Sequence, residues 1–140
     1  MIIIRSCSLI FLVVALMSHS SPQISLVKIL KKYEWEKRVI LLIADQKDTE
    51  LINDVNSFFN IKTCENNDRN LVLYKIIGKD IYNYKIPSQY HDKRGIWLIG
   101  YDGNDKLFSE DSSLLNNVYD IIDDMPMRKS EILNNKSKCY

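Results

Sequence analysis

The sequence predicts an α/β sandwich of three layers, in which helices cover both faces of a central mixed sheet of about four strands. Residues 39–44 form a continuous apolar run, which is typical of a strand covered on both faces. A helical pattern separates this run from a second apolar run at residues 69–77, as in a right-handed parallel crossover. The turn Asp102-Gly103-Asn104-Asp105 between two further runs favours an antiparallel hairpin, so the sheet is expected to be mixed.

The N-terminal half contains two predicted helices and two predicted strands. Ser25 is placed to cap a short helix with one apolar face, formed by Leu26, Val27, Ile29 and Leu30. Residues 38–44 then form the central strand. Asp48 precedes a second helix, whose apolar stripe consists of Leu51, Ile52, Val55, Phe58 and Phe59. A polar stretch at residues 62–68 leads into the second strand, residues 69–77, which Gly78 ends.

The C-terminal half begins with a long connection, residues 81–93, which has no clear period and for which a helical turn is an alternative. Residues 96–100 and 106–108 are the third and fourth strands. Ser112 or Ser113 is expected to cap a last helix, whose apolar face is Leu114, Leu115, Val118, Ile121 and Ile122. Pro126 ends this helix by excluding the helical conformation at Met125. The resulting order, β-α-β and then β-β-α, is that of thioredoxin, although other small α/β sandwiches share it.

The first 20 residues have the pattern of a signal peptide. Arg5 precedes the apolar run 9–17, which is too short to span a bilayer, and Ser18 and Ser20 stand where a signal peptidase reads. We therefore expect export to the bacterial periplasm or the extracellular space, with no stable membrane anchor after cleavage. The remaining chain is expected to form one domain, residues 23–132, followed by a flexible tail, residues 133–140.

The charge of the mature chain argues against a nucleic-acid partner. Of the 19 Lys and Arg residues, Arg5 lies in the signal peptide, so 18 basic residues remain against 18 acidic ones. A polyanion partner requires a surplus of basic side chains, which this chain lacks. The mature chain keeps two cysteines, Cys64 and Cys139, and both a disulfide between them and two separate thiols are open.

Four segments resemble the domain of unknown function 4174 family, a thioredoxin- or peroxiredoxin-like domain of bacterial exported proteins that also occurs in animal secreted proteins with sushi repeats. These segments are WEKR at residues 35–38, RNLVL at 69–73, LIGYDG at 98–103 with Lys106 and Leu107, and IDDMPMR at 122–128 with Glu131. Together they extend over nearly all of the mature chain. The resemblance implies a fold and an exported location, and it carries no established reaction.

The turn that would hold a redox cysteine in a thioredoxin-type domain, residues 45–48, contains none. Cys64 lies at the far end of the following helix, where the helix dipole raises the pKa of a thiol. Arg94 and Gly95 precede the third strand, where the fold usually has a cis-proline. We therefore expect a non-catalytic module without a cofactor that binds an unidentified protein or small molecule. The alternative is a thiol-dependent oxidoreductase or peroxidase that uses Cys64, with Cys139 as its resolving partner.

The candidate polar site consists of Asp123, Arg128 and Glu131, with Arg38 and Arg69 nearby. Its favoured interpretation is structural, because an arginine beyond a helix end can bond the last carbonyls. In the functional interpretation, Arg128 points its donors at a carboxylate or phosphate ligand, or takes part in phosphate-ester chemistry with Asp123.

Other candidate sites are weaker. His91 is expected to be a solvated loop residue, and no zinc or calcium pattern is complete. A partner surface is a further possibility, formed by the aromatic residues Tyr82, Tyr84, Tyr90, Trp97 and Tyr101, of which Trp97 is better suited to the core.

Overall fold

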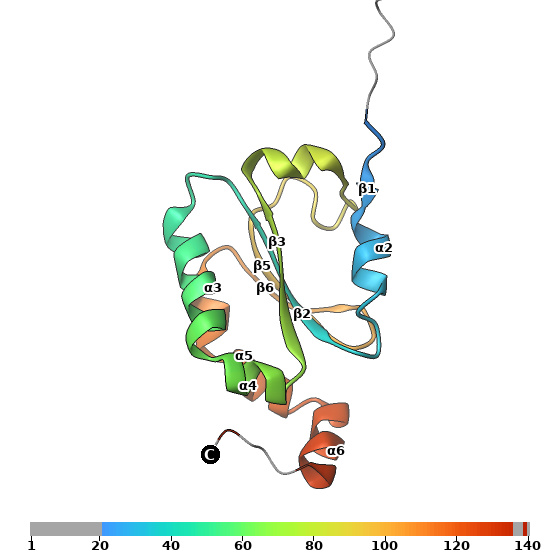
Figure 1. Cartoon of the computed structure of the whole chain (residues 1–140), viewed down its shortest axis with the longest axis vertical. Coiled ribbons are helices and arrows are strands. Elements are labelled where there is room, and N and C mark those ends of the chain that lie inside the picture. Colours follow the sequence, from blue (N-terminus) through green and yellow to red (C-terminus); the bar gives the residue numbers. More distant parts are fainter. Residues whose placement is uncertain (1–20, 136–138, 140) are drawn as a thin grey trace, which may run out of the picture.

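The central sheet has four strands in the order β3-β2-β5-β6 (Figure 1). β2 (Arg38–Ala44) lies inside the sheet and pairs in parallel with β3 (Leu71–Ile77). β5 (Gly95–Ile99) pairs antiparallel both with β2 and with β6 (Asp105–Ser109). The mixed four-stranded sheet, the central position of residues 38–44, the parallel crossover and the hairpin are therefore confirmed.

The computed structural model describes residues 21–135 and residue 139 of the 140-residue chain. The signal peptide predicted at residues 1–20 lies outside the described residues. Within the described ranges, none of the helices combines the length and the apolar character that a bilayer crossing requires.

Two apolar cores lie on the two faces of the sheet. Alternate residues of β2 point to opposite faces, so that Ile40 and Leu42 belong to one core and Val39 and Leu41 to the other. The first core includes Val55 of α3 (Thr49–Ile61), and the second is covered by α2 (Leu26–Lys31). Figure 1 shows these two helices on opposite sides of the sheet. This double cover explains why β2 is apolar at every position except Arg38.

The short helix α2 begins as the sequence predicts, but its buried face is narrower. The Ser25 hydroxyl accepts a hydrogen bond from the backbone N–H of Lys28 at 3.3 Å and so caps the helix. Leu26 and Leu30 are buried, whereas Val27 is 55% exposed, so its assignment to the apolar face was wrong. A helix of six residues presents one stripe of residues four apart to the sheet, and Val27 lies beside that stripe.

Residues 62–68, predicted as a polar connection, instead contain a helix, α4 (Thr63–Asp68). The Thr63 hydroxyl bonds back to the carbonyls of Phe59 and Asn60, which joins α4 closely to the end of α3. The buried residue of α4 is Asn66, whose side-chain oxygen accepts a hydrogen bond from the Tyr119 hydroxyl at 2.7 Å. Because α4 buries an amide rather than an apolar stripe, the sequence shows no helical period there.

The long connection after β3 is more regular than the sequence predicts. Gly78 begins a short 3-10 helix, η1 (Gly78–Asn83), so the alternative of a helical turn is confirmed. β4 (Tyr84–Lys85) follows and pairs in parallel with β1 (Ile24–Ser25). Strands of two residues have no period that a sequence pattern could reveal, and their pairing joins segments far apart in the chain.

The predicted last helix is divided in two. η2 (Ser112–Asn116) is a 3-10 helix, and α5 (Val118–Asp123) follows after a break at Asn117. The cap at its start is Asp111 rather than Ser112 or Ser113, because the Asp111 carboxylate accepts a hydrogen bond from the N–H of Ser113 at 2.9 Å. The predicted cap, Ser112 or Ser113, was therefore wrong. Aspartate and serine cap helices about equally well, so the sequence does not show which of the three adjacent residues is the cap.

Pro126 has two roles, of which the sequence predicted one. Met125 has an extended backbone, so the preceding helix ends there as expected. Pro126 is also the first residue of a further helix, α6 (Pro126–Asn134), a position that tolerates proline because its missing N–H has no partner inside the helix. Regular structure therefore continues into the first residues of the predicted tail.

The aromatic residues do not form one partner surface. Tyr90, Trp97 and Tyr101 are buried, with the rings of Tyr90 and Trp97 in edge-on contact at 5.3 Å. Tyr82, in contrast, is 76% exposed. The prediction of a single exposed aromatic surface was therefore wrong for three of its members, and the preference for Trp97 as a core residue is confirmed.

Candidate functional site

The five residues of the predicted polar site come together at the start of β2. Arg38 is the first residue of β2, Arg69 follows α4, Asp123 ends α5, and Arg128 and Glu131 lie on α6. A sixth member, Asp68 at the end of α4, was missed by sequence reasoning. We call these six residues the ionic cluster.

Asp123 is the carboxylate that joins two arginines of the ionic cluster. Arg69 donates to it through Nε at 3.0 Å and through Nη2 at 2.6 Å, a two-pronged geometry that is strong for a guanidinium and a carboxylate. Arg128 donates to the same carboxylate through Nε at 3.0 Å and to Asp68 through Nη2 at 2.6 Å. The Nη1 atom of Arg128 also donates to the Asp68 carbonyl at 2.7 Å. Every nitrogen of the Arg128 guanidinium therefore has a partner inside the protein.

Arg38 is the most deeply buried member of the ionic cluster, with 1% of its surface exposed. It donates to the Glu131 carboxylate at 3.2 and 3.3 Å and to the Arg69 carbonyl at 2.7 Å. Its guanidinium carbon lies 4.0 Å from the centre of the Tyr101 ring, which favours a cation through the ring's π face. Three guanidinium groups thus pair with three carboxylates. These contacts hold α6 and α4 against the start of β2.

The ionic cluster predicts a loss of stability in acid. Burial tends to raise the pKa of Asp123, but hydrogen bonds from Arg69 and Arg128 outweigh it and hold that pKa below the usual 3.8. The unfolded state therefore binds a proton that the folded state does not, and the contribution of Asp123 to stability is lost as pH falls through the lowered pKa.

We expect Asp123→Asn to lose less stability than the wild type as the pH is lowered below about 4, measured by urea unfolding at each pH. The variant keeps some dependence on pH, because hydrogen bonds lower the pKa values of Asp102 and Asp111 to about 2. Parallel pH profiles of the two proteins would contradict this role of Asp123.

The two cysteines of the domain form a disulfide beside the ionic cluster. Cys64 lies on α4, Cys139 follows α6, and their Cα atoms are 5.7 Å apart. Of the two alternatives that the sequence left open, the structure therefore has the disulfide. It joins Cys139 to α4, which Figure 1 shows at the end of the sheet where β2 begins.

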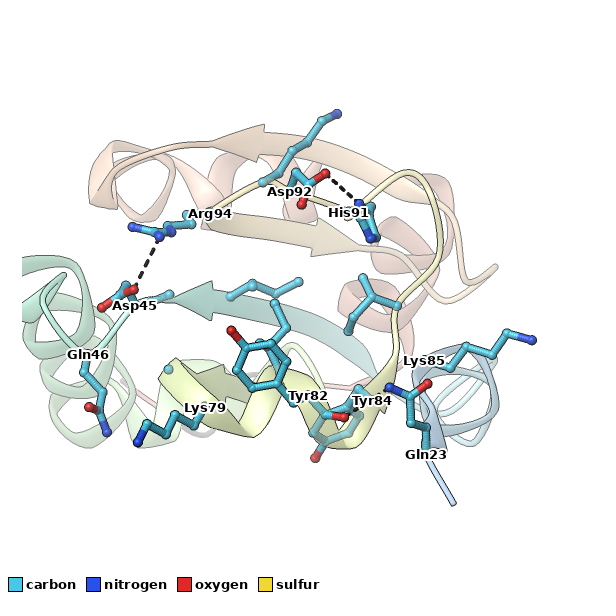
Figure 2. Close-up of a pocket in the computed structure, with 16 residues that line it drawn as sticks. Gln23, Asp45, Gln46, Lys79, Tyr82, Tyr84, Lys85, His91, Asp92 and Arg94 are labelled. Atoms are coloured by element: carbon cyan, nitrogen blue, oxygen red, sulfur yellow. Dashed lines mark hydrogen bonds and ion pairs between the residues drawn. The ribbon is translucent and has the colours of Figure 1, made fainter. Parts of the chain in front are cut away.

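A pocket of about 760 Å³ lies at the opposite end of β2. Its walls are the last residues of β2, the turn 45–46, η1, β4 and the loop 91–94 (Figure 2). We call it the β2-end pocket. It is lined by four cationic residues, Lys79, Lys85, Lys93 and Arg94, against two acidic ones, Asp45 and Asp92. Sequence reasoning missed this pocket because half of its lining residues come from the connection without a period.

The two carboxylates of the turn between β2 and α3 accept hydrogen bonds from backbone N–H groups of the same turn. The Asp48 side chain accepts a hydrogen bond from the N–H of Asp45 at 2.7 Å, and the Asp45 side chain accepts one from the N–H of Lys47 at 3.1 Å. Arg94 pairs with Asp45 at 3.3 Å (Figure 2). It also lies 4.0 Å from Asp48. The turn is therefore an ordered polar rim for the pocket.

His91 lies in the exposed loop of the β2-end pocket, as the sequence predicted. Its Nδ1 atom is 2.8 Å from the Asp92 carboxylate, and both side chains are largely exposed. Among residues 21–135 and 139, no group of three His, Cys, Asp or Glu residues has an arrangement that could hold a metal ion.

Comparison with known proteins identifies the family. A model of the family described as Domain of unknown function (DUF4174) matches residues 29–131. The chain belongs to this family. No curated protein and no solved structure matches the sequence. The match begins within α2 and ends within α6, so it includes the ionic cluster and, apart from Gln23, the lining of the β2-end pocket.

Proposed function

We propose that this DUF4174 domain is an exported, thioredoxin-like binding domain that works without thiol chemistry and binds its ligand in the β2-end pocket. The thioredoxin-like assignment is supported by the element order and by a sheet in which β2 pairs in parallel with β3 and antiparallel with β5. Export is supported by the signal-peptide pattern and by the disulfide, since disulfides persist in oxidising compartments.

The observation that carries the proposal is the separation of sulfur from the pocket. In a thioredoxin-type domain, the reactive thiolate lies at the start of the helix that follows the first central strand. In this chain, the corresponding residues are Asp45, Gln46, Lys47 and Asp48, and they line pockets. Cys64 is bonded to Cys139 beyond the start of β2. A binding role needs only the pocket, whereas a redox role needs a thiol that reaches it.

The test is a turnover assay with the purified protein, in which dithiothreitol is the reductant and either insulin or hydrogen peroxide is the substrate. We expect insulin reduction and peroxide consumption no faster than with the Cys64→Ser variant, because no thiolate lies in the pocket. A thioredoxin serves as the positive control. Turnover at enzymatic rates that disappears in Cys64→Ser would overturn the proposal in favour of a thiol enzyme.

A further inference from the structure

The β2-end pocket contains several polar side chains that have no partner among the described residues. The ammonium groups of Lys79 and Lys85, the hydroxyl of Tyr82 and the side-chain amide of Gln46 make no hydrogen bond or ion pair there. Arg94, in contrast, is held by Asp45. Figure 2 shows Lys79 and Gln46 on the same side of the pocket, and Lys85 on the opposite side beside Gln23.

Gly78 determines how closely Gln46 approaches η1. Its φ angle is +57°, in the left-handed region that favours glycine, and a Cβ atom at this position would lie 2.6 Å from Cγ of Gln46. The side chain of Gln46 therefore lies against the backbone of Gly78, which directly precedes Lys79 in the chain. Two donors, an amide N–H and an ammonium N–H, are available for one acceptor group.

The rest of the lining has an apolar part. Ile43 and Ala44 of β2 are buried, and Ile81, Tyr84 and Ile86 are half-buried at the pocket wall. Pockets that hold small molecules commonly combine such apolar walls with a few placed polar groups. The pocket lies at the carboxyl end of β2, and open α/β sheets bind ligands outside the carboxyl ends of their strands.

We propose that the β2-end pocket binds an organic carboxylate with an apolar body, such as an aryl or acyl carboxylate, and that Lys79 and Gln46 hold its carboxylate group. The inference rests on the proposed function and names the ligand class for it. We choose a carboxylate rather than a phosphate because the carboxylates of Asp45 and Asp48 lie at the start of α3, where their negative charge repels a dianion more strongly than a monoanion.

The negative charge of a neighbouring pocket favours binding of an anion in the β2-end pocket rather than there. A second pocket at the start of α3 contains six carboxylate residues, among them Glu50, Asp54, Glu110 and Asp111, against three cationic residues. An anion is repelled there and attracted to the β2-end pocket. The bound carboxylate is therefore expected to perturb Gln46, Gly78 and Lys79 and to leave Glu50 and Asp111 unchanged.

The test is a titration of the full mature protein with 4-phenylbutyrate, followed by two-dimensional ¹H–¹⁵N NMR. Acetate, inorganic phosphate and the neutral 4-phenylbutanol are titrated in parallel. We expect 4-phenylbutyrate to shift the amide signals of Gln46, Gly78 and Lys79 at concentrations at which the other three compounds have no effect. Higher salt weakens the binding, because the attraction is between exposed charges.

Variants separate the carboxylate contact from general attraction. Lys79→Gln is expected to weaken binding about fivefold, the effect of losing one partly exposed ion pair. Lys85→Gln, on the opposite side of the same pocket, is the matched control and is expected to change the affinity less than twofold. Both lysines are exposed, so both variants are expected to fold.

Three results would overturn the inference: no shift with 4-phenylbutyrate, equal shifts with 4-phenylbutanol, or equal losses in the two lysine variants. Equal binding of 4-phenylbutanol rejects the carboxylate and leaves a binding domain. Failure of the proposed function has a different signature, which is turnover that depends on Cys64.

Discussion

Replacing Arg128 with methionine is expected to lower the free energy of unfolding by about 3 kcal/mol. Methionine keeps most of the buried side-chain volume but removes the three guanidinium nitrogens that bond Asp123, Asp68 and the Asp68 carbonyl. The two carboxylates are then left half-buried beside each other, with Arg69 as the remaining cation for Asp123. Loss of one partner from a buried ionic network costs far more than loss of a surface ion pair. Urea unfolding at pH 7 measures the difference.

Lys129→Met is the matched control on the same helix. Lys129 pairs with Asp124 at 2.7 Å, but both side chains are exposed, so we expect a loss of no more than about 1 kcal/mol. Equal losses in Arg128→Met and Lys129→Met would contradict the view that the ionic cluster fastens α6 to the domain. The comparison also decides between the two interpretations of the polar site, since a ligand-binding arginine contributes little to the stability of the free protein.

Removing the disulfide is expected to have the largest effect on stability. Cys64 and Cys139 are 75 residues apart in the sequence, and in the chain-entropy model closing a loop of this length stabilises the folded state by about 4 kcal/mol. The double variant Cys64→Ser and Cys139→Ser is expected to lose about this amount and to remain folded, because the ionic cluster still holds α6.

Urea unfolding with and without dithiothreitol checks this prediction. The wild type in dithiothreitol should become as unstable as the double variant, and the double variant should not respond to dithiothreitol. A double variant as stable as the oxidised wild type would show that the disulfide does not stabilise the domain.

The elements that the sequence predicted well are those with long apolar patterns. In β2, apolar and polar residues do not alternate, because both faces of the strand are buried. In α3, apolar residues four apart form a clear stripe, because one side of the helix packs on one face of the sheet. The elements that were missed have no such pattern. α4 buries Asn66, and β1 and β4 are strands of two residues that pair across the chain, so their contacts depend on the folded structure alone.

The candidate sites divide in the same way. Asp123, Arg128 and Glu131 were predicted because an arginine just beyond a helix end can bond the last carbonyls and pair with an acidic neighbour. Arg38 and Arg69 were expected nearby, and the structure brings all five together. Asp68 was missed because nothing in a polar helix distinguishes one carboxylate from its neighbours. Lys79 was missed for a different reason. Its importance comes from the pocket formed by η1, β4 and the turn after β2, which lie together only in the fold.

The central claim is that the DUF4174 domain binds through the β2-end pocket without using sulfur. The most direct test measures the affinity for 4-phenylbutyrate of the wild type and of the double variant Cys64→Ser and Cys139→Ser, under conditions in which both are folded by NMR. We predict dissociation constants that agree within twofold, because the disulfide lies at the other end of β2. Binding by the wild type that is lost in the folded double variant would contradict the claim.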